Sequence, residues 1–196
     1  MKKTTALLPL LLAAVLTLAA CGSEETSDAG GESSTTTAPF NDADVEFARD
    51  MIPHHEQAVQ MAQLADGRAE SAEVKQLAED IEAAQAPEIE QMSAWLESWG
   101  EDVPSDSMDH GDMGHGSPSE MPGMMDADEM NRLERTRGAD WDRRFLTGMI
   151  EHHEGAIEMA RVEQAEGENP DALDLAEKVE KDQQAEISEM ERLLGS

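Results

Sequence analysis

Two adjacent pairs of histidines are the side chains of this sequence best suited to chemistry. The first pair lies in MIPHHEQAVQMA, residues 51–62, and the second in MIEHHEGAIEMA, residues 149–160. Each histidine of the first pair has a counterpart 98 positions further on, and methionines flank both pairs at helical spacing. The candidate metal ligands of the two segments are Met51, His54, His55, Met61, Met149, His152, His153 and Met159.

Both histidines of each pair are expected to face a protein core. On a helix, His54 shares a stripe with Met51, Ala58 and Met61, and His55 lies on the neighbouring apolar stripe. An imidazole inside a core needs a hydrogen bond or a metal ion. The alternative is a histidine bonded only to a neighbouring helix. Because the pair is duplicated and flanked by thioethers, we favour metal binding.

A second group of potential ligands lies between the repeats, in MDHGDMGHGSPSEMPGMM, residues 108–125. Its glycines and prolines leave no helix or strand period, so we expect a loop. Thioethers beside imidazoles suit Cu(I) or Ag(I), and histidine with aspartate suits Cu(II); the alternative is a linker of biased composition. The candidate ligands here are Met108, His110, Met113, His115, Met121, Met124 and Met125.

A glutamine and a glutamate recur on the second predicted helix of each half. Gln85 and Glu88 fall within an apolar stripe, and Gln183 and Glu186 do the same 98 residues later. A buried carboxylate is costly unless it is paired. We therefore expect these four side chains to hydrogen-bond the histidines and orient them, as partners of metal-bound imidazoles often do. A direct ligand role for the two glutamates stays open.

These elements predict an all-α domain made of two repeated helical hairpins. Residues 41–100 and residues 139–194 each contain a helix, a short turn and a second helix. Packing their apolar stripes together gives a four-helix bundle with a pseudo-two-fold axis. The Met/His-rich loop, residues 101–125, and a short helix within residues 126–138 would join the hairpins.

Four residues refine this picture of the hairpins. Pro53 and Pro87 interrupt helical patterns in the first half only, which predicts either bent helices or a break at Pro53. Asp44 and Asp142 match across the repeat and lie near helix starts. We expect them to cap the helices or to interact with the helix dipoles.

The start of the chain has the pattern of a bacterial lipoprotein signal. Residues 1–20 combine a positive start with an apolar run that is short for a membrane span. The sequence LAAC is similar to a lipobox, which implies cleavage before Cys21 and lipidation of its thiol. Residues 21–40 are small and polar and predict a flexible tether. Lipid chains would then anchor the domain, residues 41–196, to the bacterial cell membrane outside the cytoplasm.

Composition excludes several classes of function. The sequence has 14 basic and 44 acidic residues and a formal net charge of −30. Nucleic acid is therefore a poor partner, because phosphate binding needs a cationic patch. Cys21 is the only cysteine, so disulfides within one chain and thiolate metal sites are excluded.

The duplicated H-H-x-x-A-x-x-M-A helices, the Q-x-x-E-I-x-x-M helices and the MPGMM element resemble the bacterial family called domain of unknown function 305 (DUF305). The resemblance covers residues 44–194 and implies a ferritin-like four-helix fold. It also implies extracytoplasmic copper binding or tolerance, with which some members are associated. The ligands that carry over are those of the two histidine segments and three methionines of the loop, Met121, Met124 and Met125. The sequence departs at Glu151, where the first half has Pro53, so the two half-sites need not have the same shape.

The predicted function is copper binding, buffering or tolerance by a membrane-tethered protein outside the cytoplasm. Cu(I) is favoured over Cu(II), other transition metals stay open, and a protein that donates or accepts copper is an expected partner. One alternative is a ferritin-like di-metal oxidase, for which no Glu-x-x-His with an inward glutamate is present in either histidine pair. We therefore lean against an enzyme. The other alternative is an interaction module whose histidines make only structural contacts.

Overall fold

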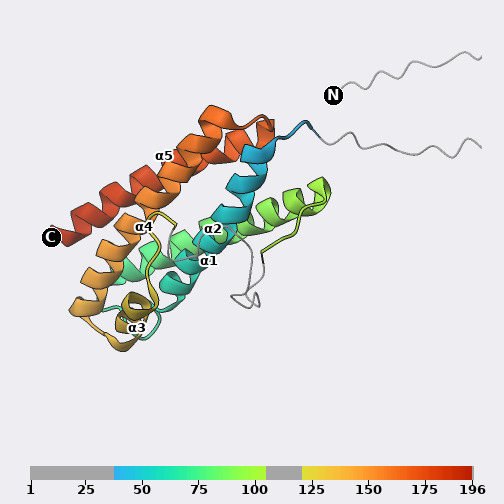
Figure 1. The fold of residues 1–196 in the computed structure, drawn as a ribbon. Helices are drawn as coiled ribbons and strands as arrows, with labels where there is room; N and C mark the ends of the chain where they lie inside the picture. Colours follow the sequence, from blue (N-terminus) through green and yellow to red (C-terminus); the bar gives the residue numbers. More distant parts are fainter. Residues whose placement is uncertain (1–37, 105–120, 196) are drawn as a thin grey trace, which may run out of the picture. The chain divides into compact units, whose positions relative to one another are not determined.

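Helices make up all the regular structure of the described domain. The computed structural model describes residues 38–104 and 121–195, which belong to one compact unit, and every regular element in these ranges is helical. The helices are α1 (Asp42–Gln63), α2 (Ala72–Trp99), α3 (Ala127–Arg135), α4 (Ala139–Glu166) and α5 (Pro170–Leu194) (Figure 1). Among them, none has both the length and the apolarity that crossing a membrane requires.

Short polar residues before the helices fix where most of them begin. Asn41, Ser71, Asp126 and Asn169 each accept a hydrogen bond from a backbone N–H in the first turn of the helix that follows. These caps satisfy backbone donors that have no partner within the helix. The predicted starts and ends of the helices therefore agree with the structure to within about two residues.

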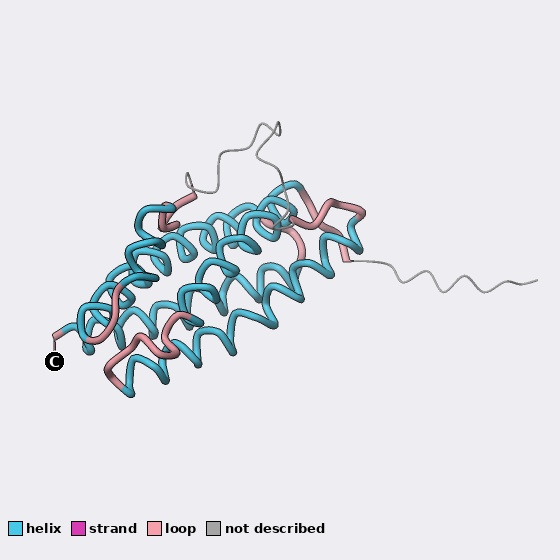
Figure 2. The backbone as a smooth tube through the Cα atoms, turned by 90° about the horizontal axis from the view of Figure 1, so that it is seen from below, coloured by secondary structure: helices cyan, strands magenta, loops and turns pink. Residues whose placement is uncertain are grey.

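The helices form two hairpins that meet through their first members. α1 packs along α2, α4 packs along α5, and α1 contacts α4, with α3 lying against α4 (Figures 1 and 2). Met61, late in α1, belongs to the same core cluster as Phe145, early in α4. Met51, early in α1, belongs to the same cluster as Ala156, later in α4. This pattern fits antiparallel packing, and the predicted all-α bundle of two repeated hairpins is confirmed.

Two aspartates at matching positions tie each hairpin to the turn of the other. Asp44 accepts a backbone hydrogen bond from Asn169, 2.8 Å away in the α4–α5 turn, and also completes the capping box of its own helix. Asp142 accepts backbone hydrogen bonds from Glu70 at 3.0 Å and Ser71 at 2.9 Å, in the α1–α2 turn. The predicted capping role of Asp44 is confirmed. In addition, both carboxylates stabilise the contact between the hairpins.

The prolines of the first half do not interrupt its helices. α1 continues through Pro53 and α2 continues through Pro87. The alternative that the first helix ends at Pro53 and starts again is therefore wrong. Packing on both sides of each proline outweighs the one hydrogen bond that the missing N–H removes.

Candidate metal centre

The contact between α1 and α4 brings one histidine of each repeat together. The rings of His54 and His152 have centroids 3.8 Å apart and planes inclined at 40°. Both side chains are buried, and so are those of His55 and His153. Each histidine lies on an apolar stripe, and burying the stripes turns the rings toward the core. The predicted inward orientation of all four imidazoles is confirmed.

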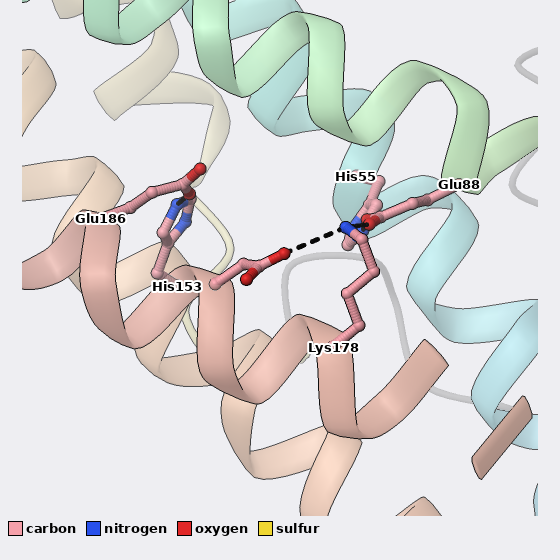
Figure 3. A network of polar contacts seen from close by, with 6 residues as sticks. His55, Glu88, His153, Lys178 and Glu186 are labelled. Carbon is pink, nitrogen blue, oxygen red and sulfur yellow. Dashed lines mark hydrogen bonds and ion pairs between the residues drawn. The ribbon is translucent and has the colours of Figure 1, made fainter. Parts of the chain in front are cut away.

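His55 and His153 each donate a hydrogen bond to a glutamate on the second helix of their own hairpin. His55 Nε2 lies 2.8 Å from Glu88 Oε2 of α2, and His153 Nε2 lies 2.6 Å from Glu186 Oε2 of α5 (Figure 3). These bonds fix the tautomer, so each ring presents the lone pair of Nδ1. The predicted contacts between histidine and glutamate are therefore present in both halves.

The two histidine–glutamate pairs differ because Glu88 also forms an ion pair with a lysine, a contact that the sequence did not predict. Lys178 Nζ of α5 lies 2.6 Å from Glu88 Oε1 of α2 (Figure 3), whereas Glu186 pairs with no Lys or Arg of the described residues. Burial raises the pKa of Glu88, but the hydrogen bonds from His55 and Lys178 outweigh it and leave that pKa below its usual value. Asp80 occupies the position equivalent to Lys178 in the first half, so the repeat gave no signal for this contact.

Several buried polar atoms of the histidines and of two glutamines have no hydrogen-bond partner among the described residues. They are Nδ1 of all four histidines, Nε2 of His152, both amide atoms of Gln85 and Oε1 of Gln183. The expected hydrogen bond from Gln85 to a histidine is therefore not formed, because Glu88 already accepts the ring proton of His55. Buried polar atoms without partners are rare in proteins, and such a group indicates a place for water or an ion.

Burial keeps the two central histidines neutral. Desolvation, together with the nearby His55 and His153, lowers the pKa of His54 to about 3 despite a hydrogen bond to the Pro122 carbonyl. Desolvation and the other three histidines hold the pKa of His152 well below its ordinary value. At neutral pH the lone pairs of both rings are therefore available to a metal ion without the loss of a proton.

The methionines predicted as ligands divide between the two core clusters. Met61 and Met149 are buried in one core cluster, against which Met125 packs, whereas Met51 is buried in the other cluster, with Met159 packed against it. Met121 and Met124 are half-buried. Four candidate ligands of the loop lie outside the described residues: Met108, His110, Met113 and His115. The signal segment and the lipidation site, Cys21, also lie outside them.

The donor set fits a soft metal ion. Within residues 38–104 and 121–195, no group of three His, Cys, Asp or Glu side chains converges closely enough to hold an ion. An ion near His54 and His152 would need a few imidazole nitrogens completed by thioethers. Such donors favour Cu(I) or Ag(I), whereas Mg²⁺ and Ca²⁺ require oxygen ligands. The unpartnered nitrogens of the two central rings are the atoms that could bind it.

Comparison with known proteins identifies the family. Residues 44–194 match the family model described as Domain of unknown function (DUF305). The chain therefore belongs to the DUF305 family, as its duplicated motifs predicted. No curated protein matches the chain significantly.

Solved structures share the fold and a recognisable sequence. A DUF305 protein from Streptomyces coelicolor is 33% identical with a TM-score of 0.69, covering 78% of this chain and 92% of that one. A DUF305 fragment from Deinococcus radiodurans is 31% identical with a TM-score of 0.70, covering 80% and 98%. CopM in its Cu(II)-bound form is 33% identical with a TM-score of 0.64, covering 78% and 95%. CopM has also been solved in Cu(I)-bound and Ag-bound forms.

Proposed function

We propose that this protein binds copper, mainly as Cu(I), and buffers it or hands it on outside the cytoplasm. In the bundle, His54, His55, His152 and His153 supply imidazoles. Thioethers from the two histidine segments complete this site; they belong to Met51, Met61, Met149 and Met159. The segment between the hairpins captures or passes on ions through Met108, His110, Met113, His115, Met121, Met124 and Met125.

The observation that carries the proposal is the contact between His54 and His152. A buried nitrogen without a partner costs roughly 1–3 kcal/mol, and this pair holds three such atoms. Apolar side chains of similar size would make a more stable core at this point. A soft metal ion bound by these nitrogens would explain why the pair is buried. CopM, a relative of similar fold, has been solved with copper and silver bound.

A purely structural role explains only part of this cluster. His55 and His153 donate to glutamates, so an interaction module without metal would account for those two rings. It would account less well for His152, neither nitrogen of which makes a hydrogen bond of good geometry in the described part of the chain, although the ring interacts with the backbone of His54. A di-metal oxidase would need several converging carboxylates, and no such group is found among the described residues.

The anchoring of the protein is a further part of the proposal. Removal of residues 1–20 would leave Cys21 at the start of the mature chain, with a lipid on its sulfur. Residues 21–40 would then act as a tether for the bundle. A protein that donates copper to this one, or accepts copper from it, would meet it at the outer surface of the membrane.

The test is a competition titration of the full chain with Cu(I) and a chromogenic chelator. The wild-type chain should bind at least one ion tightly. Replacement of all four bundle histidines with glutamine (His54→Gln, His55→Gln, His152→Gln, His153→Gln) should remove the bundle ion while leaving the weaker binding of the loop. Glutamine keeps a polar side chain of similar size, and circular dichroism would show that the helices remain.

The matched control changes the two histidines outside the bundle, His110→Gln and His115→Gln. That variant should keep the tight ion and lose only binding by the loop. If the variant without bundle histidines takes up the same number of Cu(I) ions with the same affinity, the bundle is not the binding site.

A further inference from the structure

The segment Met121–Met125, called the strap below, lies against both α1 and α4. The Pro122 carbonyl accepts a hydrogen bond from His54 Nε2 at 3.1 Å. Three residues later, Gln57 of α1 holds the strap backbone with both ends of its amide. Met125 N–H donates to Gln57 Oε1 at 2.8 Å, and Gln57 Nε2 donates to the Met125 carbonyl at 2.9 Å. The strap therefore covers a central histidine at one point and is held in place at another.

Three glycines allow the strap to lie this close to α4. A Cβ atom at Gly155 would lie 1.9 Å from the Pro122 oxygen, and one at Gly148 would lie 1.8 Å from Cε of Met125. Within the strap, Gly123 has a φ of 76°, and a Cβ there would lie 2.3 Å from the Glu151 oxygen. A side chain at Gly123 or Gly155 would meet backbone atoms and push the strap and α4 apart, whereas one at Gly148 would displace the flexible end of Met125.

Apart from the bond between His54 and Pro122, the contacts with the strap occur at positions where the two repeats differ. Gln57 in the first repeat corresponds to Gly155 in the second, and Asp50 corresponds to Gly148. The histidines and methionines around these positions are identical in both repeats. α1 thus provides an amide that binds the strap where α4 provides the space that receives it. The pseudo-two-fold symmetry is broken at the residues that seat the strap.

A groove on the surface leads to the strap. It has a volume of about 470 Å³, lies along α3 and α4, and has Met125, Gly148 and Glu151 in its lining. Met125 also packs against the core cluster that contains Met61, and the methyl groups of both methionines lie close to Gly148. Met125 therefore lies between the groove and the buried thioether of Met61. The Pro122 carbonyl accepts the hydrogen bond of a buried imidazole nitrogen, that of His54.

We propose that the strap controls metal exchange at the buried histidines. When Met121–Met125 moves away, His54 and Met61 become accessible from the groove, and Gln57 is the positioning residue that keeps the strap closed. This proposal rests on the copper-binding function proposed above. The strap itself has three thioethers, at Met121, Met124 and Met125, so soft ligands are present where an ion enters.

The first experiment needs no metal. Hydrogen–deuterium exchange of the full chain should show a protected amide at Met125 in the wild type. Gln57→Ala removes the acceptor of that amide, and Gly155→Ala displaces the strap from the opposite side without touching Gln57. Both variants should exchange at least about tenfold faster over residues 121–125. Gln63→Ala changes an exposed glutamine of the same helix, which hydrogen-bonds Glu82 and does not contact the strap in the hydrogen bonds of the described residues, and should exchange like the wild type.

The second experiment measures how fast the Ag(I)-loaded chain passes its ion to a small-molecule thiol. Gln57→Ala and Gly155→Ala should release Ag(I) at least about tenfold faster than the wild type and Gln63→Ala, with an unchanged number of bound ions. Gln57→Glu keeps the acceptor for Met125 N–H and loses the donor, so its release rate should be intermediate.

The outcomes separate the strap proposal from the copper-binding proposal. Unchanged exchange over residues 121–125 in both loosened variants would show that Gln57 and Gly155 do not hold the strap. Faster exchange combined with an unchanged rate of Ag(I) release would show that the strap does not control access. If the wild type binds no Ag(I) at all, the copper-binding function fails, and the exchange data still report whether the strap is held as described.

Discussion

Replacing both His54 and His152 with leucine should stabilise the metal-free protein by about 2 kcal/mol and weaken Cu(I) binding at least about 100-fold. The two rings hold three buried nitrogens without a partner among the described residues. Leucine has a similar volume and buries no polar atom, so the change removes these penalties and loses one hydrogen bond, to Pro122. Opposite effects on stability and on binding are typical of residues kept for function.

Urea unfolding in a buffer containing a metal chelator measures the stability part of this prediction. The matched control is the change of the outer rings to leucine, His55→Leu with His153→Leu. It removes the donors to Glu88 and Glu186 and should lower the free energy of unfolding by roughly 1–3 kcal/mol. Equal destabilisation by both double variants would contradict the view that the central rings are unsatisfied in the absence of metal.

The advantage of the leucine variant should grow as the solution becomes acidic. In the unfolded chain His54 binds a proton near pH 6.5, whereas in the folded protein its pKa is about 3. The unfolded state therefore binds more protons between these values, so acidification below pH 6.5 lowers the free energy of unfolding of the wild type. Leucine binds no proton, and the variant should lack this part of the acid sensitivity.

Replacing Glu163 with glutamine should stabilise the protein at pH 7 by about 3 kcal/mol. Glu163 of α4 is 1% exposed, and neither carboxyl oxygen has a hydrogen-bond donor among the described residues unless the group itself is protonated. Burial, a hydrogen bond with Asp44 and the charge of Asp44 raise the pKa of Glu163 to about 8. Asp44 already accepts backbone hydrogen bonds as a carboxylate, so Glu163 is the member of the pair that keeps a proton.

The direction of this effect follows from the protons bound in each state. Unfolded Glu163 loses its proton near pH 4.5, whereas folded Glu163 keeps it up to about pH 8. Since the unfolded state binds fewer protons in this window, raising the pH lowers the free energy of unfolding by up to about 1.4 kcal/mol per pH unit. A glutamine amide donates to Asp44 at every pH and avoids this loss.

Unfolding curves at several pH values between 5 and 8 would measure the difference between wild type and Glu163→Gln. That difference should be small near pH 5 and should rise with pH. Glu166→Gln is the matched control, because Glu166 is exposed and lies three residues further along the same helix. A difference that stays constant across the range, or that equals the effect of Glu166→Gln, would show that Glu163 is ionised in the folded protein.

The repeat made much of the fold and part of the site predictable. A 98-residue offset that preserves apolar stripes requires two similar hairpins, and capping residues such as Asn41 and Ser71 mark where helices begin. Because the histidines and glutamates fell on those stripes, the burial of the histidines and of Glu88, and a contact between histidine and glutamate within each hairpin, were predictable. The pairing of His55 with Glu88 and of His153 with Glu186 became known only from the structure.

Features that depend on how the hairpins meet were not predictable in this way. Helix periodicity shows that a ring faces inward, but it does not show that His54 lies against His152 rather than beside a glutamine. The contact of Lys178 with Glu88 depends on the position of α5 relative to α2, whereas its other partner, Asp182, lies one turn away on the same helix. Burial of Gln85 was correctly predicted, but its hydrogen bond to a histidine was not formed.

One signal in the sequence would have revealed the strap. Comparison of the two histidine segments shows Gln57 where the second has Gly155, and Asp50 precedes the first pair where Gly148 precedes the second. A glycine within a helix lowers its stability by roughly 0.5–1 kcal/mol relative to alanine, so two glycines in one repeat indicate close approach of another segment. The repeats also differ at Glu163, which corresponds to Ala65 in the first repeat, so the same comparison would have drawn attention to Glu163.

The most direct test of copper binding by the buried histidines is the X-ray absorption spectrum of the full chain loaded with one equivalent of Cu(I). We expect nitrogen ligands with the multiple scattering typical of imidazole, together with sulfur, and a weaker imidazole signal in the His54→Leu, His152→Leu variant. A copper shell made only of sulfur, or an imidazole signal of unchanged strength in that variant, would contradict copper binding by the two central rings.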